Sequence, residues 1–130
     1  GVIQGGQGYI FIGENIGEIS ARTQWLKSLF ETSNIHCTVS QDIHQDVWRK
    51  FAWNCIFNIV SATTQLTVGK IVNDPEKIQL CKDIFNEIQQ VAKSQDVVLG
   101  TDKEKLIFDI AGDSGDIKPS TFPLTNEKIE

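Results

Sequence analysis

The longest mainly apolar stretch of the sequence runs from Phe51 to Ala62 and reads Phe51-Ala52-Trp53-Asn54-Cys55-Ile56-Phe57-Asn58-Ile59-Val60-Ser61-Ala62. Asp42 and Asp46 precede it, and acidic residues in the first turn stabilise a helix through its dipole. Because apolar residues occur nearly all round this helix, we expect it to be buried on most sides. Residues 42–64 are therefore predicted to form the central helix of a mainly α domain.

Three further helices are predicted around this central one. The spacing of apolar residues over 17–31 is typical of an amphipathic helix. Asp74 as the capping residue and Pro75 at the first helical position begin a long helix, whose apolar stripe repeats every three or four residues to about Val97. Residues 63–73 between the central helix and this one are expected to form a loop.

The last predicted helix covers residues 102–111. Thr101-Asp102-Lys103-Glu104 has the pattern of a capping box, and Gly112 stands where a glycine commonly ends a helix. The residues from 112 to 130 are rich in glycine, aspartate, serine, proline and threonine, so we expect them to be mostly loop.

The start of the chain predicts a short β segment. Residues 9–12 are aromatic and β-branched, and the glycines at 5–8 favour a turn, so we interpret residues 1–13 as a hairpin or linker strand. Residues 33–40 are expected to form another short extended segment. Residues 14–130 then form the helical domain.

Composition excludes several classes of protein. The net charge of -5, with lysines and acids interspersed, argues against a nucleic-acid partner. No apolar run approaches the roughly 20 residues of a membrane span, and no signal peptide opens the chain, so we expect a cytoplasmic protein without a membrane partner. The three cysteines, Cys37, Cys55 and Cys81, lack metal-ligand spacing, so we predict buried free thiols and no metal site.

Three polar residues interrupt the apolar helix at intervals of four: Lys50, Asn54 and Asn58. Each step of four turns the helix by about 40°, so the three side chains form a slanting stripe. A lysine beside a partly dry cleft can donate a proton, and asparagine amides can orient hydroxyl, carbonyl or carboxylate groups. The alternative is structural: Lys50 extends to solvent from the helix start, and the asparagines bond loop backbone.

The stretch Trp48-Arg49-Lys50-Phe51-Ala52-Trp53-Asn54-Cys55-Ile56-Phe57-Asn58 resembles the W-x-K-x-x-x-N-x-x-x-N signature of the ketopantoate reductases, also called 2-dehydropantoate 2-reductases. Residues 9–14 resemble the strand that leaves the cofactor domain in this family. Residues 66–71 resemble its loop after the signature helix, and residues 118–121 its late serine motif. The resemblance covers most of the chain in the expected order.

The resemblance implies a role for each matched residue. The family reduces a small 2-keto acid with NADPH in the synthesis of pantothenate, the precursor of coenzyme A. Lys50 matches its general acid, which protonates the developing alkoxide. Asn54 and Asn58 match residues that hold the substrate, and Ser120 matches the serine that contacts its carboxylate end. The implied fold is the helical C-terminal domain of a two-domain dehydrogenase, similar to that of 6-phosphogluconate dehydrogenase.

The cofactor is expected to bind elsewhere. No GxGxxG motif follows a strand in this sequence, so we predict no cofactor-binding residue in the chain and an N-terminal Rossmann domain as its partner. Related reductases also form homodimers through such helical domains. The late substrate-binding glutamate of the family has no assigned counterpart, since Glu127 and Glu130 lie too early, and we expect the chain to end within this domain.

Two other functions stay open at this point. The first is a non-catalytic helical dimerisation or interaction module, in which an apolar patch replaces the lysine-centred cleft. The second is an enzyme that uses Lys50 as a Schiff-base nucleophile without any cofactor. Borohydride trapping with a keto acid distinguishes this last possibility.

Overall fold

The computed structural model describes residues 9–116, which divide into two compact units with the boundary between Val47 and Trp48. The sequence had suggested a division between residues 13 and 14. The first predicted helix packs against the strand that follows it, and that strand pairs with the strand before the helix, so the three form one unit. The boundary falls inside a helix.

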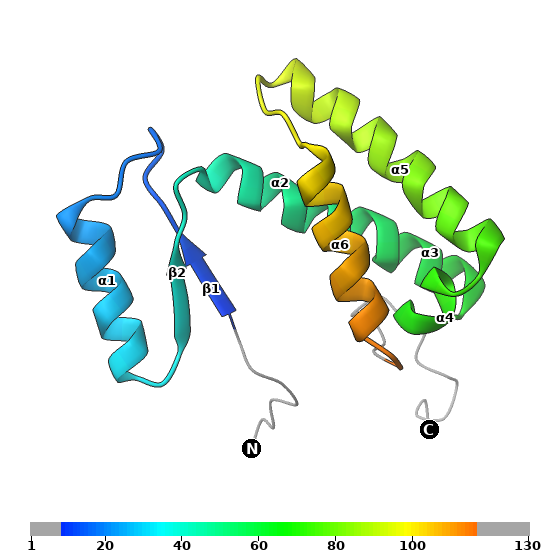
Figure 1. Ribbon diagram of the computed structural model, residues 1–130, viewed down its shortest axis with the longest axis horizontal. Coiled ribbons are helices and arrows are strands. Elements are labelled where there is room, and N and C mark those ends of the chain that lie inside the picture. Colours follow the sequence, from blue (N-terminus) through cyan, green and yellow to red (C-terminus); the bar gives the residue numbers. More distant parts are fainter. Residues whose placement is uncertain (1–8, 117–130) are drawn as a thin grey trace, which may run out of the picture. The chain divides into compact units, whose positions relative to one another are not determined.

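The first unit is a strand–helix–strand arrangement (Figure 1). It contains β1 (Tyr9–Ile12), α1 (Ala21–Thr32) and β2 (His36–Val39). The two strands are parallel, in a register that runs from Tyr9 opposite His36 to Ile12 opposite Val39. Parallel strands need a crossover connection, and α1 provides it. The strand at residues 9–12 and the extended segment within 33–40 are thus present, while the expected hairpin partner of β1 lies outside the described residues.

The second unit is helical, and its elements follow one another with short connections. They are α2 (Ile43–Trp53), which begins in the first unit, η1 (Asn54–Asn58), α3 (Ile59–Thr64), α4 (Val68–Val72), α5 (Pro75–Ser94) and α6 (Thr101–Asp113). The helix predicted at residues 42–64 is continuous in space but contains a turn of π-helix, η1. Gln65 ends it in the left-handed conformation, with φ 57°.

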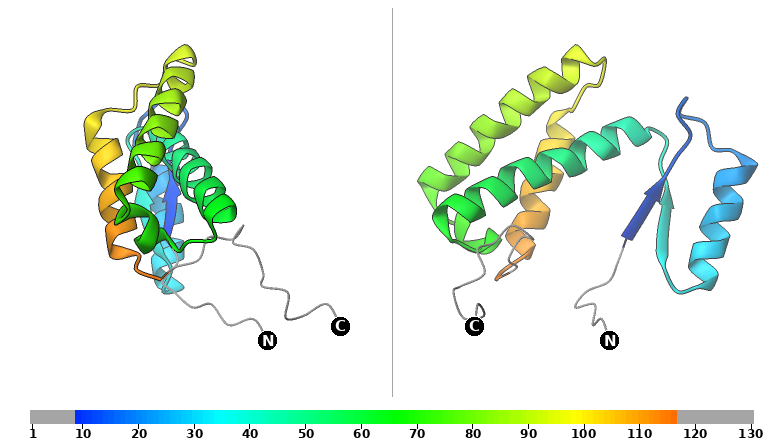
Figure 2. Two further views of the ribbon diagram at one scale, coloured as in Figure 1. Left: turned by 90° about the vertical axis from the view of Figure 1, so that its right-hand side faces the viewer. Right: turned by 180° about the vertical axis from the view of Figure 1, so that it is seen from behind.

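The core of the second unit forms where α5 lies along η1 and where α4 packs against α5 and α6 (Figure 2). The predicted stripe of α5 is buried and meets the inner face of the central helix. Its buried apolar residues include Ile56, Phe57, Val60, Val68, Ile71, Cys81, Phe85, Ile88, Ala92 and Ile107. The mainly α fold class with a short N-terminal β segment is confirmed.

Some helix ends lie where the sequence predicts them, and others do not. Asp74 caps α5 as predicted, accepting hydrogen bonds from the backbone N–H groups of Glu76 and Lys77. The predicted capping box at Thr101 is wrong, because Gly100 is the N-cap of α6 and no side chain bonds there. Gly112 lies inside α6, which ends one residue later.

The loop expected at residues 63–73 contains a short helix, α4. Because this helix is only five residues long and has Gly69 as its second residue, it has too few residues for an apolar period to be recognised in the sequence. None of the helices in the described part of the chain is long and apolar enough to span a membrane.

Candidate functional site

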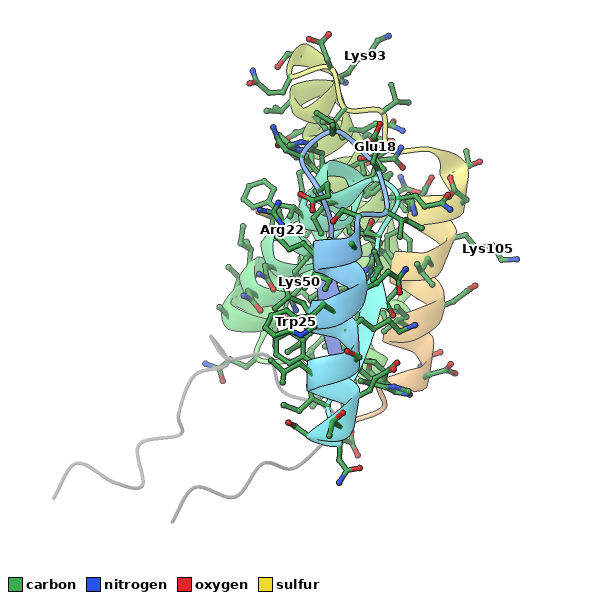
Figure 3. All side chains as sticks on the ribbon, turned by 90° about the vertical axis from the view of Figure 1, so that its left-hand side faces the viewer. Glu18, Arg22, Trp25, Lys50, Lys93 and Lys105 are labelled. Carbon is green, nitrogen blue, oxygen red and sulfur yellow. The ribbon has the colours of Figure 1, made fainter. Side chains whose placement is uncertain are left out.

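The signature residues lie on the solvent side of the central helix. Lys50, near the end of α2, and Asn54, at the start of η1, are exposed, and Asn58 at the end of η1 is half-buried. Figure 3 labels Lys50, and it also labels Lys93 of α5 and Lys105 of α6. The opposite face carries Ile56 and Phe57 into the core. The helix therefore presents its polar residues on one side and its packing residues on the other.

The π-turn changes how the stripe is arranged. In an α-helix, which has 3.6 residues per turn, residues four apart diverge by about 40°. A π-turn closes i to i+5 hydrogen bonds and so holds more residues per turn. Asn54 and Asn58 are the first and last residues of this turn, so the 40° divergence of an α-helix does not apply between them. Single π-turns within α-helices occur frequently at functional sites.

The expectation that this helix is buried on most sides is wrong on the signature face. Phe51, directly after Lys50, keeps 49% of its surface exposed, and Ile59 is exposed one residue after Asn58. The ring of Phe51 meets the ring of Trp48 edge-on, with centroids 5.6 Å apart and planes at 87°. Aromatic pairs favour this arrangement, so Trp48 holds Phe51 in place beside the lysine.

This face therefore combines one ammonium group, two amides and an aromatic surface within the described residues. An ammonium can donate a proton to an oxygen on which negative charge develops, and amides can both donate and accept hydrogen bonds. The exposed aromatic ring offers apolar contact to the carbon skeleton of a small ligand. The arrangement suits a small molecule that has one charged or polar end and one apolar side.

The thiols take no part in such chemistry. Burial raises the pKa of Cys81 to about 11, and desolvation also raises the pKa of the half-buried Cys55. Since the thiolate is the reactive form of cysteine, both side chains are poor nucleophiles. Cys37, Cys55 and Cys81 are free thiols, and the residues from 9 to 116 contain no group of three or more His, Cys, Asp or Glu side chains able to hold a metal ion.

The two histidines have structural contacts. His36 stacks on Tyr9 across the strand pair, with ring centroids 5.6 Å apart. A ring nitrogen of His44 lies 3.2 Å from the backbone oxygen of Asn15. Neither belongs to the helical face that carries Lys50.

In the second unit, hydrogen bonds also connect the end of the signature helix to α4 and α4 to the segment after α6. The hydroxyl of Ser61, which is buried, donates to the backbone oxygen of Leu66 at 2.6 Å. Further on, the backbone N–H of Gly69 donates to the oxygen of Gly115 at 2.8 Å. Ser120, the fourth residue predicted for the site, lies outside the described residues, as do Glu127 and Glu130.

The sequence profile described as "Ketopantoate reductase PanE/ApbA C terminal" matches residues 42–123, from the start of the signature helix past Ser120. The chain belongs to this family. The match includes all four residues predicted for the site, and it extends across both the exposed stripe and the contact between α4 and the end of α6.

The names of two individual relatives agree with this family assignment. The 2-dehydropantoate 2-reductase of Mesorhizobium japonicum is 32% identical over 111 residues, which are 84% of this chain and 33% of that protein. The 2-dehydropantoate 2-reductase of Archaeoglobus fulgidus is 23% identical over 90 residues, 69% of this chain and 31% of that protein. The chain thus spans about a third of the length of the curated relatives it matches.

A solved structure shares the fold. The crystal structure of 2-dehydropantoate 2-reductase from Geobacter metallireducens GS-15 superposes with a TM-score of 0.77 at 24% identity, over 89% of this chain and 39% of that one. This likeness shows that the two chains share a fold over the matched residues.

Sequence reasoning missed the exposed aromatic beside the lysine and the contact of Gly69 with Gly115. Phe51 stands in an apolar run, and nothing in that run marks which ring faces solvent. Gly69 lies in the motif that resembles the family's loop, but its partner is far along the chain in a segment without a pattern. Only the folded chain shows that the two glycines meet.

Proposed function

We propose that this chain is the substrate-side domain of an NADPH-dependent reductase that converts 2-dehydropantoate to pantoate, with Lys50 as the general acid. One observation carries the proposal: the family match runs through a helix whose exposed face presents Lys50, Asn54 and Asn58 on consecutive turns. Two relatives with the name 2-dehydropantoate 2-reductase support the choice of substrate.

The proposed chemistry assigns one task to each side chain. Reduction of a 2-keto acid turns the carbonyl oxygen into an alkoxide, and an ammonium group held beside that oxygen both stabilises the charge and supplies the proton. Lys50 has this role. The amides of Asn54 and Asn58 orient the substrate by hydrogen bonds, Ser120 binds its carboxylate end, and the ring of Phe51 covers its alkyl side.

NADPH, which supplies the hydride when bound, does not fit the described residues. The obvious place for its phosphates is the N-terminus of α1, after β1. That terminus is already closed, because the hydroxyl of Ser20 accepts from the N–H of Thr23 at 3.1 Å. Glu14 pairs with Arg22 nearby, so this guanidinium is already engaged by a carboxylate. We propose that the cofactor is held by residues other than those described.

The arrangement of the first unit is nevertheless compatible with a position in a cofactor-binding domain. Sheets made of parallel strands usually have several strands, with both faces covered, and two strands alone are marginally stable. β1 and β2 are parallel and joined by a helix, as in nucleotide-binding folds. The proposal is that they extend the sheet of an N-terminal Rossmann domain of the same protein.

The experiment follows NADPH oxidation by the full-length protein that contains this chain, with 2-dehydropantoate and a panel of other 2-keto acids. General acids contribute about 10²–10⁴-fold, so Lys50→Ala should lower kcat by that factor. Lys93→Ala is the matched control, since Lys93 is an exposed lysine near the end of α5 and should leave kcat unchanged. An inactive wild type would refute the proposed reaction. Full activity of Lys50→Ala would refute the role of the lysine.

A second candidate is a helical dimerisation module. Leu106 and Ile110, one turn apart on α6, are both exposed, and such an apolar pair favours self-association. Sedimentation equilibrium would detect a dimer, and Leu106→Glu should dissociate it. A dimer without reductase activity on any 2-keto acid would favour this function over the first, while an active dimer is compatible with both.

A further inference from the structure

Two aromatic rings contact each other on the signature helix, and they differ in exposure. Trp48 is half-buried and packs against the core of the second unit. Phe51, three residues further along α2, keeps 49% of its surface exposed. The two rings meet edge-on, with centroids 5.6 Å apart and planes at 87°. Trp48 therefore links the core to a ring that a ligand can reach. We call these two residues the aromatic pair.

The exposed ring lies along the stripe of polar side chains. Residues three or four apart are neighbours on the surface of a helix. Asn54 follows Phe51 by three residues and Lys50 by four, so its side chain borders both of them. A molecule whose carbonyl group lies against Lys50 and Asn54 would therefore have the ring of Phe51 beside the atoms next to that carbonyl.

Its surroundings distinguish Phe51 from other apolar residues of the second unit. Phe57 and Phe85 are both 0% exposed and form part of the core, so neither ring can reach a ligand. Leu80 on α5 is exposed to a similar extent, at 44%, but single exposed apolar side chains are ordinary on a protein surface. Phe51 has in addition a second ring that supports it and the polar stripe beside it.

The chemistry of the proposed substrate matches this arrangement. 2-Dehydropantoate has a quaternary carbon, with two methyl groups, directly beside its keto carbon. When the keto oxygen lies at Lys50, these methyl groups lie on the part of the molecule that is next to the ring of Phe51. An apolar pocket distinguishes substrates that differ by a single methylene group by about 10- to 200-fold in kcat/KM. A ring at this position therefore affects which 2-keto acids are used well.

We propose that the aromatic pair selects 2-keto acids that are branched at the carbon beside the keto group. Phe51 contacts the methyl groups, and Trp48 is a positioning residue that holds the ring of Phe51 along the polar stripe. The inference rests on the proposed function, because it requires a 2-keto acid at Lys50. The apolar contact is present in both the ground and transition states, and loss of such binding raises KM while kcat is retained.

The test uses two substrates that differ only in the methyl groups, 2-dehydropantoate and 4-hydroxy-2-oxobutanoate, with NADPH and the full-length protein. The ratio of their kcat/KM values measures the selectivity for the branched substrate. Because the half-exposed ring covers one side of the substrate, Phe51→Ala should lower this ratio by about tenfold, at the lower end of the range for an apolar contact. The change should be a higher KM for 2-dehydropantoate, while both constants for the unbranched substrate change by less than about threefold.

Two variants at Trp48 separate positioning from packing. Trp48→Phe keeps an aromatic ring against Phe51, whereas Trp48→Leu keeps only an apolar side chain against the core. The geometry of an aromatic pair contributes about two- to tenfold beyond its buried area, so Trp48→Leu should lower the selectivity ratio by about that factor. Trp48→Phe should retain the ratio of the wild type. A role of Trp48 in packing alone predicts the same ratio in both variants.

Leu80→Ala is the control for the loss of an exposed apolar side chain. Leu80 lies on α5 rather than on the signature helix, so its replacement should leave the selectivity ratio and both KM values unchanged. Phe51→Ala removes no buried ring, so the variant should fold and its kinetic constants should be measurable.

The possible results separate this inference from the proposed function. An unchanged ratio in Phe51→Ala, an equal fall in Leu80→Ala, or a wild type that reduces both substrates equally well would overturn the selectivity of the aromatic pair. Equal ratios in Trp48→Leu and Trp48→Phe would overturn the positioning role of Trp48. Each of these results leaves the proposed function standing, whereas a wild type that reduces no 2-keto acid would refute the proposed function and this inference with it.

Discussion

Two phenylalanines of the central helix provide a matched test of its orientation. Phe57 is 0% exposed, with its ring 4.5 Å from that of Trp53 and 6.3 Å from that of Phe108. Phe51 keeps 49% of its surface exposed. Replacing a buried phenylalanine by alanine loses its transfer free energy and leaves a cavity, so Phe57→Ala should lower the free energy of unfolding by about 3–5 kcal/mol.

The same substitution at Phe51 should have a much smaller effect. Full burial of a phenylalanine stabilises by about 1.5–3 kcal/mol, and Phe51 is half exposed, so Phe51→Ala should cost about 1 kcal/mol. Urea unfolding followed by far-UV circular dichroism measures both changes through the shift in midpoint. Equal losses at the two positions would refute the assignment of one face to the core and the other to solvent.

Three further properties follow from the structure. Asp74→Ala removes the acceptor of the Glu76 and Lys77 N–H groups, and should lower the free energy of unfolding by about 1 kcal/mol in urea, while Asp74→Asn should retain most of it. The pKa of Cys81 is raised from 9.0 to about 11 in the folded state, so its contribution to stability is present below pH 9 and is lost as the pH rises towards 11. The wild type should therefore lose stability relative to Cys81→Ala over this range, by up to about 1.4 kcal/mol per pH unit, and parallel pH profiles would contradict this. The same thiol should resist iodoacetamide in the folded protein and react in urea, as read by mass spectrometry of the Cys81 peptide.

Local sequence signals predicted those elements whose pattern is long or strongly marked. α5 has a cap at Asp74, a proline at its first position and a buried stripe from Cys81 to Ala92, so several signals agree. β1 and β2 were recognisable as short β-branched runs. Their pairing was not, because two parallel strands joined by a helix have no turn signature, and the glycines at 5–8 favoured a hairpin instead.

The candidate site was only partly predictable. The spacing of Lys50, Asn54 and Asn58 identified the stripe, and the family match covers it. The π-turn between the two asparagines could not be predicted, because it uses residues that are equally compatible with an α-helix. The exposure of Phe51 was missed for a related reason: an apolar run predicts burial, whereas a face that binds a partner or ligand also carries apolar residues.

The contact of Gly69 with Gly115 could not be predicted from the sequence alone. The lack of space for a side chain at Gly69 arises only when α4 meets the backbone of Gly115, which follows α6. Gly115 has a requirement of its own, because its φ of 51° lies in the left-handed region that L side chains rarely adopt.

Chemical rescue of Lys50→Ala in the full-length protein tests the central claim most directly. If Lys50 supplies the proton, the variant should lose about 10²–10⁴-fold in kcat, and added methylammonium should restore the rate of 2-dehydropantoate reduction in proportion to its concentration. The control, Lys93→Ala, should neither lose activity nor respond to the amine. A variant that loses activity but does not respond to any small amine, or one that matches the wild type, would contradict the assignment of Lys50 as the proton donor.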